Sequence, residues 1–257
     1  MRVLSKPSVT IRRVFGAMLL LPVVFVVLYD QRFGGFMVML LALFMTLEVK
    51  RITNLPPITG YLVVGLIMAQ SIPHWVIHRP VEFTHGLALL VATMVLFNIK
   101  KNIVALFTGL LSLCFGYASL LLMQPSGHIM LVTLAAIIAA FDSAAYFVGR
   151  SVGGAKLWPQ VSPKKTISGS IGGLVAAAGI TMVLADVIGL AGPLDALILG
   201  LVLGILAQAG DLLESAIKRC LKVKDSGSIL PGHGGMLDRF DGYILATPAF
   251  YLYLFEI

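Results

Sequence analysis

The sequence is short of charge and almost free of cysteine. Only 12% of its 257 residues are Asp, Glu, Lys or Arg, whereas soluble domains carry about 25%. The two cysteines, Cys114 in an apolar run and Cys220 in a basic segment, cannot supply a disulfide framework. With 58% hydrophobic residues and a mean hydropathy of +0.97, the chain is predicted to have lipid as its main solvent. An ordinary soluble domain and a disulfide-stapled scaffold are both excluded.

Long apolar runs are abundant and are spread along the whole chain. They fall near 14–29, 33–48, 57–72, 83–98, 103–123, 128–148, 168–192, 194–212 and 243–256. A bilayer core of about 30 Å needs roughly 20 helical residues, and backbone groups in lipid must be hydrogen-bonded within their own segment. We therefore predict an all-α polytopic integral membrane protein with about nine transmembrane helices. The third, fourth and ninth runs are short, and a re-entrant segment is the alternative for each.

Basic residues predict the orientation in the membrane. If the N-terminus is cytoplasmic, all of the 19 Lys and Arg residues except Arg32 and Arg79 fall on the inner side, as the positive-inside rule requires. The C-terminus then lies outside. The net charge of +7 is interpreted as attraction to anionic lipid headgroups and phosphates, and no nucleic-acid partner is expected.

Acidic residues indicate where chemistry takes place. Predicted helices one to five carry no acid or base in their central turns, whereas transporters usually have polar sites near the midplane. The acids on or near the inner side are Glu48, Asp142, Asp211, Glu214, Asp225, Asp238 and Asp241. We therefore divide the chain into residues 1–127, a membrane scaffold that faces lipid and a dimer partner, and residues 128–257, the catalytic membrane region. The cytosolic loops of the second region are predicted at 149–167 and 212–242.

The loop that follows Asp211 concentrates charged residues at helical spacing. Asp211, Glu214 or Ser215, Lys218 and Lys222 would share one face of a helix. Carboxylates and lysines together can bind a nucleotide phosphate with Mg²⁺, which takes one or two carboxylates and completes its shell with phosphate oxygens and water. Solvated loop charges or simple ion pairs are the alternative.

The second half of the same loop supplies a turn and two further carboxylates. Pro231 breaks the helix, and the glycines up to Gly235 would let backbone N–H groups approach an anion. Asp238 and Asp241 are spaced i, i+3 and share a face if helical. Two aspartates about 5 Å apart repel by about 3 kcal/mol at an effective dielectric of 20, so a cation between them is the favoured arrangement.

A second polar group consists of Asp142, Lys164 and Lys165. Asp142 lies about two turns inside the predicted sixth helix, where an isolated carboxylate costs about 2.5–3.5 kcal/mol, so it should face a polar or metal-containing cavity. The alternatives are a paired structural aspartate and two lysines that only follow the positive-inside rule.

Residues 211–241 resemble the signature of the phosphatidate cytidylyltransferase (CDP-diacylglycerol synthase) family. The matching residues are Ser215, Lys218, Arg219, Lys224, Asp225, Gly227, Pro231, His233, Gly234, Gly235, Asp238, Arg239 and Asp241. Weaker similarity extends back to about Phe141. Before helix six the chain resembles the family only in hydropathy.

This resemblance implies a homodimer, multi-pass in the bacterial inner membrane, with a cytosol-facing cavity open to lipid. It implies metal ligation by Asp211, Asp238 and Asp241, with Mg²⁺ as cofactor and K⁺ as a candidate second ion. Lys218, Asp225 and His233 are the expected catalytic residues. The expected substrate-binding residues are Asp142, Lys164, Lys165, Ser215, Arg219, Lys224, Gly234, Gly235 and Arg239. One departure is Ile167-Ser168, where the family usually has Trp-Glu, which predicts altered substrate selection there.

The function predicted from the sequence is phosphatidate cytidylyltransferase, a nucleotidyltransferase of phospholipid biosynthesis. A phosphate oxygen of phosphatidate would attack the α-phosphorus of CTP, releasing pyrophosphate and forming CDP-diacylglycerol. The alternatives are a CTP-dependent polyprenol or phytol kinase, a CDP-archaeol synthase-like enzyme and, from another class, a membrane transporter.

Overall fold

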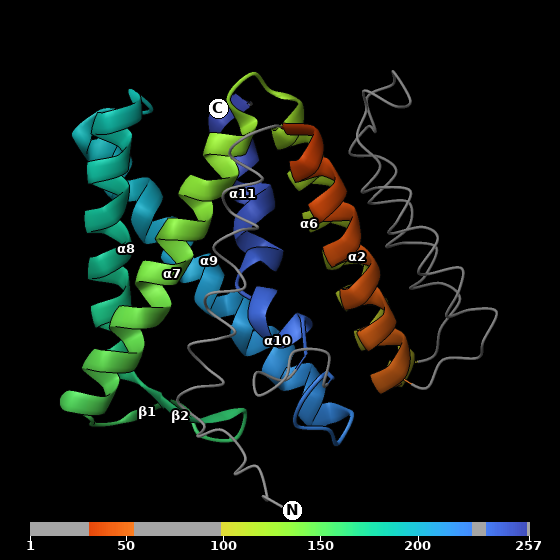
Figure 1. The fold of residues 1–257 in the computed structure, drawn as a ribbon. Coiled ribbons are helices and arrows are strands. Elements are labelled where there is room, and N and C mark those ends of the chain that lie inside the picture. The colour runs from red at the N-terminus through yellow and green to blue at the C-terminus, as the bar shows by residue number, and fades with distance from the viewer. Residues whose placement is uncertain (1–30, 54–98, 228–234, 256–257) are drawn as a thin grey trace, which may run out of the picture.

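The computed structural model describes residues 31–53, 99–227 and 235–255. The elements are α2 (Gln31–Thr53), α6 (Ile99–Met123), α7 (Gly127–Ser151), β1 (Lys156–Trp158), β2 (Ser162–Thr166), α8 (Ile167–Ile188), α9 (Pro193–Cys220), α10 (Leu237–Phe240) and α11 (Tyr243–Phe255). Three predicted spans, at 14–29, 57–72 and 83–98, lie outside the described residues. Each of the other six apolar runs coincides with a helix, which confirms a mostly helical membrane protein (Figure 1).

Five helices of the described part are long and apolar enough to cross a bilayer. They are α2, α6, α7, α8 and α9. The last helix, α11, has 13 residues and contains Pro248, so it is shorter than the roughly 20 residues of a full span. Nine spans stay a prediction.

Two features of the polar segments differ from the sequence prediction. Helix α9 continues to Cys220, so the predicted loop 212–242 begins as helix, and Lys222, outside α9, does not share its face. Residues 149–167, predicted as a loop, contain the antiparallel hairpin β1–β2, in which Lys156 pairs with Thr166 and Trp158 with Ser162. Hydropathy did not indicate these strands because the segment has few apolar residues.

Local sequence signals explain where α8 and α9 begin and end. Thr166 caps α8, since its Oγ1 accepts a hydrogen bond of 3.1 Å from the N–H of Gly169. Gly189 ends α8 with a φ of 64°, which glycine adopts without strain. Pro193 occupies the first turn of α9, where its missing N–H leaves no intrahelical bond unmade.

Small residues let α7, α8 and α9 approach closely. A Cβ on Gly173 of α8 would lie 2.8 Å from the ring of Phe141 on α7, and one on Gly200 of α9 would lie 2.7 Å from Ala178 Cα on α8. Helices in lipid associate through such close packing, because lipid tails are as apolar as the side chains. These three helices therefore form one tightly packed layer.

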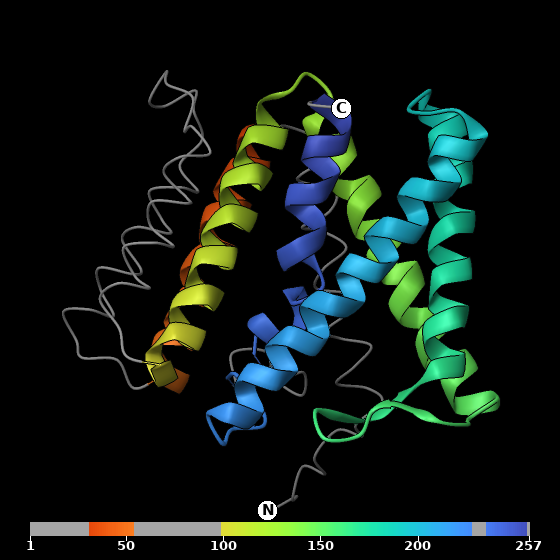
Figure 2. The ribbon, with the colours of Figure 1, turned by 180° about the vertical axis from the view of Figure 1, so that it is seen from behind.

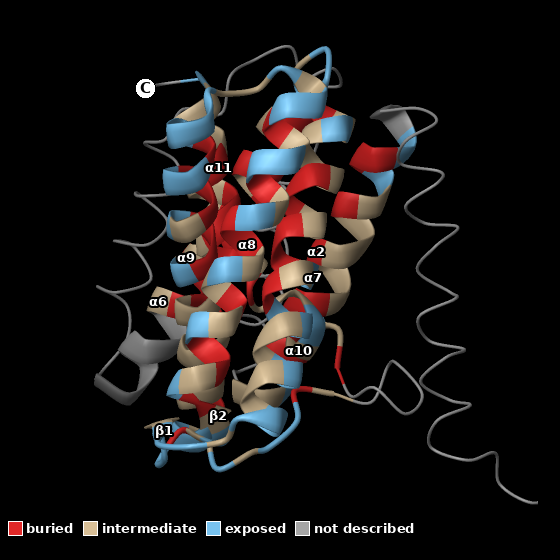
Figure 3. Cartoon of the chain, turned by 90° about the vertical axis from the view of Figure 1, so that its left-hand side faces the viewer, coloured by how far each residue is buried: buried red, intermediate tan, exposed pale blue. Residues whose placement is uncertain are grey.

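Buried apolar side chains form two clusters. One joins α2, α6, the end of α9, α10 and the start of α11, around Met45, Phe107 and Leu237. The other joins α6, α7, α8, α9 and α11, around Leu134 and Phe250. Helix α11 contributes to both and lies in the middle of the bundle (Figures 1 and 2). Exposed residues, several of them apolar, cover the outward helix faces (Figure 3).

The polar segments gather at one end of the bundle. The hairpin, α10 and the last turns of α9 lie together, while the α6–α7 and α8–α9 turns lie at the opposite end (Figures 1 and 2). The last turns of α2, α7 and α9 carry the basic residues Lys50, Arg51, Arg150, Lys218 and Arg219. Segments that the charge pattern assigned to one side of the membrane thus meet at one end of the structure.

We predict that Gly200→Ala destabilises the bundle. Its Cβ would lie 2.7 Å from Thr181 Oγ1 and 2.8 Å from Ala177 O, so α8 and α9 must separate, with a loss of about 1–3 kcal/mol in the free energy of unfolding. Thermal unfolding in detergent measures this. Gly179→Ala is the matched control because nothing lies within 4 Å of its added Cβ; an equal fall in both variants would contradict the packing.

Candidate active site

A cavity of about 530 Å³ opens at the end of the bundle that carries the hairpin. It lies between α7, β2, the first turn of α8 and the middle of α9. Its charged lining residues are Asp142, Arg150, Lys156, Lys164, Lys165 and Asp211. The volume lies within the range of about 300–1,000 Å³ that small-molecule sites occupy. Asp142, Lys164 and Lys165, which the sequence grouped together, therefore line the same cavity as Asp211, which was predicted to belong to the loop that follows it.

An ion pair joins the two predicted groups directly. Lys165 Nζ of β2 donates to Asp211 Oδ2 of α9, and both side chains are about a quarter exposed, at 27% and 26%. Ser215, one turn further along α9, has its Oγ 3.5 Å from Asp211 Oδ1. Asp211 thus connects the cavity with the last turns of α9.

Close backbone packing sets the position of the hairpin. A Cβ on Gly169 of α8 would lie 2.6 Å from Ala145 O of α7, and one on Gly149 would lie 2.7 Å from Thr166 Oγ1. The hairpin links the ends of these two helices, and Ser168 Oγ adds a hydrogen bond to Gly153 O. The hairpin is short and is anchored at both ends, to α7 and to α8. Its residues Lys164 and Lys165 are therefore held beside α7 and α9.

Asp241 lies at the junction between α10 and α11, and this junction packs against Gly210 of α9. A Cβ on Gly210 would lie 2.5 Å from Asp241 O, so only glycine allows this contact beside Asp211. Burial raises the pKa of Asp241 well above its ordinary value, and the nearby carboxylates of Asp211, Glu214 and Asp142 raise it further. Four carboxylates therefore act on one another at this point.

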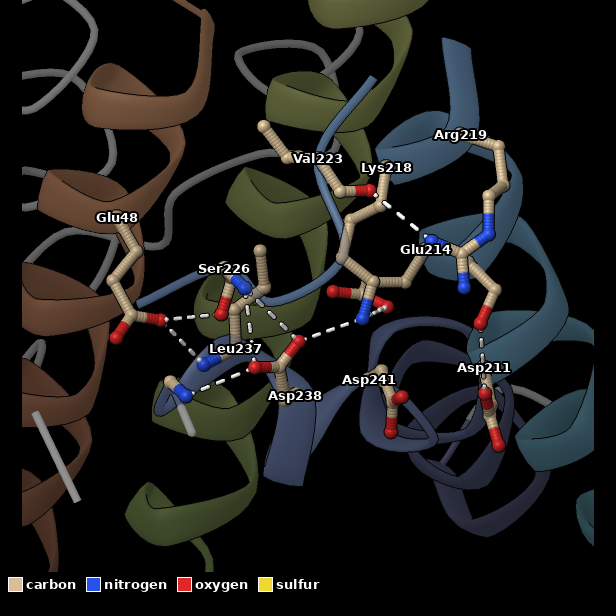
Figure 4. A network of polar contacts seen from close by, with 12 residues as sticks. Glu48, Asp211, Glu214, Lys218, Arg219, Val223, Ser226, Leu237, Asp238 and Asp241 are labelled. Atoms are coloured by element: carbon tan, nitrogen blue, oxygen red, sulfur yellow. Dashed lines mark hydrogen bonds and ion pairs between the residues drawn. The ribbon is translucent and has the colours of Figure 1, made fainter. Parts of the chain in front are cut away.

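Lys218, about two turns beyond Asp211 on α9, is buried between two carboxylates. Its Nζ lies 2.6 Å from Glu214 Oε2 and 2.6 Å from Asp238 Oδ1, as Figure 4 shows. The side chain of Glu214 is 1% exposed. Its carboxylate forms an ion pair with Lys218 at 2.6 Å and makes no well-oriented hydrogen bond with any described residue. The helical spacing predicted the Glu214–Lys218 neighbourhood, but Asp238 comes from α10.

Asp238 also binds the backbone of the loop. Its Oδ2 accepts hydrogen bonds from the N–H of Gly235 at 2.9 Å and of Ser226 at 3.1 Å. Burial alone would raise the pKa of Asp238, but the hydrogen bond from Lys218, the two backbone N–H groups and the lysine charge together hold that pKa below its ordinary value. Asp238 is therefore a charged acceptor in this structure, engaged by protein donors.

Glu48 of α2 belongs to the same network, and sequence reasoning missed it. It is 3% exposed and accepts hydrogen bonds from Ser226 Oγ at 2.9 Å, the N–H of Met236 at 2.9 Å and the N–H of Leu237 at 2.8 Å (Figure 4). The available signal was its place on the inner side together with the other acids.

The other predicted site residues at the end of α9 and directly after it are exposed. The N–H of Val223 bonds to Lys218 O at 2.9 Å and that of Lys222 to Arg219 O at 3.0 Å, the two bonds of a Schellman motif. Lys222 has a φ of 58°. The predicted residues Arg219, Lys224 and Asp225 are all exposed beside this turn, so the structure brings none of them into the cavity.

His233 and Gly234 lie outside the described residues. Ile167 and Ser168, predicted to alter substrate selection, are not among the cavity-lining residues; the Ser168 side chain ties the hairpin to α8 instead. Their effect on substrate selection stays a prediction.

A profile of the Cytidylyltransferase family matches residues 10–256. The chain belongs to this family. Within it, the chain is 46% identical over 130 residues to the phosphatidate cytidylyltransferase of Brucella suis biovar 1 (strain 1330), a match that covers 51% of this chain and 48% of that protein. It is 49% identical over 123 residues to the phosphatidate cytidylyltransferase of Bacillus subtilis (strain 168), covering 46% and 44% respectively.

A third relative carries the description uncharacterized. The uncharacterized protein YnbB of Escherichia coli (strain K12) is 38% identical over 157 residues, which is 58% of this chain and 53% of that protein. The chain spans about half the length of the curated relatives it matches. The family is therefore established, and the substrates are a matter of proposal.

We predict that Lys218→Met destabilises the protein strongly, because it leaves the buried Glu214 and Asp238 without their cation. Breaking a buried ion pair on one side costs about 3–5 kcal/mol. Adding Glu214→Gln should recover part of the loss, and Lys224→Met, at an exposed lysine, should change stability little. Thermal unfolding in detergent is the measurement. Equal stability of Lys218→Met and Lys224→Met would mean that the ion pairs carry no weight.

Proposed function

We propose that the chain is a phosphatidate cytidylyltransferase, which forms CDP-diacylglycerol from CTP and phosphatidate at the cytosolic face of a membrane. The observation that carries the proposal is the convergence of the Lys165–Asp211 and Lys218–Asp238 pairs at one end of the bundle. Its support from relatives is the 46% and 49% identity to proteins of that name.

The proposed reaction is an in-line nucleotidyl transfer. A phosphate oxygen of phosphatidate attacks the α-phosphorus of CTP, the bond from that phosphorus to the bridging oxygen breaks, and pyrophosphate leaves with its electron pair. No protein nucleophile is needed because the lipid phosphomonoester is already anionic. The protein contributes positioning and charge neutralisation.

The cationic side chains of the cavity are assigned to the phosphates. Lys164, Lys165 and Arg150 line the cavity and can neutralise the triphosphate and the lipid phosphate, while Lys218, which is buried outside the cavity lining, stays a predicted phosphate contact. The exposed residues Lys224 and Asp225, together with His233 and Gly234 outside the described residues, stay predicted members of the pocket. Arg219, Arg239 and Ser215 stay predicted substrate-binding residues.

The carboxylates fit Mg²⁺ as the cofactor. Burial raises the pKa of Asp241, and the charges of Asp211, Glu214 and Asp142 raise it further; a divalent cation would relieve that repulsion. Among the described residues, no three His, Cys, Asp or Glu side chains form a ready-made metal site, but Mg²⁺ commonly takes one or two carboxylates and completes its shell with substrate phosphate and water. When bound, it would neutralise charge on the phosphates.

Asp211 and Asp241 are the ligands that we favour for this ion. The third predicted ligand, Asp238, has its oxygens engaged by Lys218 and by two backbone N–H groups, so a direct metal bond would have to displace protein donors. K⁺ remains the proposed second ion.

The membrane arrangement extends the same proposal. We propose nine spans, a cytoplasmic N-terminus, an external C-terminus and a homodimer in the bacterial inner membrane. In this arrangement residues 1–127 are the scaffold and residues 128–257 the catalytic region. Support comes from the basic residues at the cavity end of α2, α7 and α9, which the positive-inside rule places in the cytoplasm.

The labelled product of the reaction distinguishes the proposed cytidylyltransferase from a CTP-dependent lipid kinase, the alternative that the sequence left open. The two reactions differ in the phosphorus attacked. A kinase transfers the γ-phosphoryl group and releases CDP, whereas a cytidylyltransferase transfers CMP and releases pyrophosphate. Purified protein with phosphatidate, Mg²⁺ and CTP labelled at either phosphorus should place only the α-label in lipid; γ-label in lipid would refute the proposal in favour of the kinase.

We predict that Asp211→Asn and Asp241→Asn each lower turnover in this assay by about 100-fold or more, because a bound metal contributes several kcal/mol of charge stabilisation. Excess Mg²⁺ or Mn²⁺ should recover part of the activity by mass action. Asp186→Asn, at an exposed position near the other end of α8, is the control and should keep its turnover. Near-normal turnover in either site variant would refute the assignment of that residue.

We predict opposite membrane sides for Gln124, in the α6–α7 turn, and Ser226, in the loop that Asp238 binds. Reporter fusions at the two positions, one reporter active only in the cytoplasm and one only outside it, measure this. Ser226 should score as cytoplasmic. If both positions report the same side, the proposed topology is wrong.

A further inference from the structure

Glu48 connects the first half of the chain to the candidate active site. It lies near the end of α2, within the region predicted to be a scaffold, and is 3% exposed. Its carboxylate bonds to residues 178 and 189 positions away, Ser226 and Leu237.

The carboxylate of Glu48 holds both described ends of the loop that contains the Pro-Gly-His-Gly-Gly sequence. At one end it accepts the hydroxyl of Ser226, and at the other it accepts the N–H groups of Met236 and Leu237, where α10 begins. A buried carboxylate without donors would be costly, so these three bonds fix its position and the loop ends together.

Two glycines of the family signature are required by this carboxylate. A Cβ on Gly227 would lie 2.3 Å from Glu48 Oε1, and its three nearest neighbours are all atoms of the Glu48 side chain. A Cβ on Gly235 would lie 2.6 Å from Glu48 Oε2 and against Ser226 Oγ. Both positions are glycine because Glu48 occupies the space that a side chain would need.

The same loop ends hold Asp238, which holds Lys218. The N–H groups of Ser226 and Gly235 donate to Asp238 Oδ2 at 3.1 and 2.9 Å, and Lys218 Nζ donates to Oδ1 at 2.6 Å. Figure 4 shows the sequence of contacts from Glu48 through Ser226 and Asp238 to Lys218. A shift of Glu48 therefore shifts both backbone donors of Asp238.

We propose that Glu48 is a positioning residue that sets the place of the Lys218–Asp238 pair for binding the CTP phosphates. The inference rests on the proposed function for the identity of the ligand. The placement of the pair is independent of the proposed function, because it follows from the hydrogen bonds of Glu48 and from the two glycines. The role proposed for Glu48 acts through its protein partners Ser226, Met236 and Leu237.

Kinetics of Glu48→Gln test the positioning role. The amide nitrogen of Gln would face N–H and O–H donors, so at least one donor loses its partner and the loop ends move. The KM for CTP should rise about tenfold, since one lost hydrogen bond to a charged group is worth that much, while the KM for phosphatidate stays unchanged. A merely structural role would reduce the amount of active enzyme and leave both KM values unchanged, and that result would overturn the proposal. Asp186→Asn is the control.

A double-mutant cycle tests the placement without any activity measurement. Gly227→Ala should lower the unfolding temperature in detergent by several degrees, because its methyl group meets the Glu48 carboxylate. In the Glu48→Ala background that methyl group has room, so the same change should cost less than half as much. Equal costs in both backgrounds would overturn the inference. If the wild-type protein transfers no label from CTP, the proposed function fails, and this cycle alone decides the placement.

Discussion

The charge of Lys218 is the constraint on which the polar end of the structure depends. An ammonium group buried at the end of an apolar bundle requires carboxylates around it, because an unpaired buried charge costs several kcal/mol. Glu214 supplies one from the preceding turn of α9 and Asp238 supplies the other from α10. Once Asp238 is directed at Lys218, its second oxygen holds the N–H groups of Ser226 and Gly235, and these described ends of the loop are held between α9 and α2.

Helix α9 carries most of this arrangement. Its 28 residues pass from the close contact with α8 at Gly200, past the contact with the α10–α11 junction at Gly210, to Lys218. The two glycines set how near the neighbouring segments come, and of the acids that follow Gly210, Asp211 lines the cavity and Glu214 pairs with Lys218. Because one continuous helix bears Asp211, Glu214 and Lys218, the cavity and the buried lysine have a fixed separation.

Much of the fold could be predicted from the sequence, since hydropathy and helical spacing are local properties. Six of the nine apolar runs coincide with helices, and the neighbourhood of Glu214 and Lys218 follows from a spacing of one turn. The 149–167 hairpin could not be predicted in this way, because it depends on where the ends of α7 and α8 meet. The spacing of Asp211, Glu214 and Lys218 predicted that the helix continues past the apolar run, but its end at Cys220, before Lys222, was not predicted.

By itself, the sequence determined the membrane class, the gathering of basic residues at one end and the family signature between Asp211 and Asp241. Each of these is a property of composition or of short-range order. Only the tertiary structure decided that Lys165 pairs with Asp211, that Asp238 holds Lys218, and that Glu48 closes the loop from a position 178 to 189 residues away. Contacts over such separations depend on how the helices pack, and no spacing along the chain encodes them.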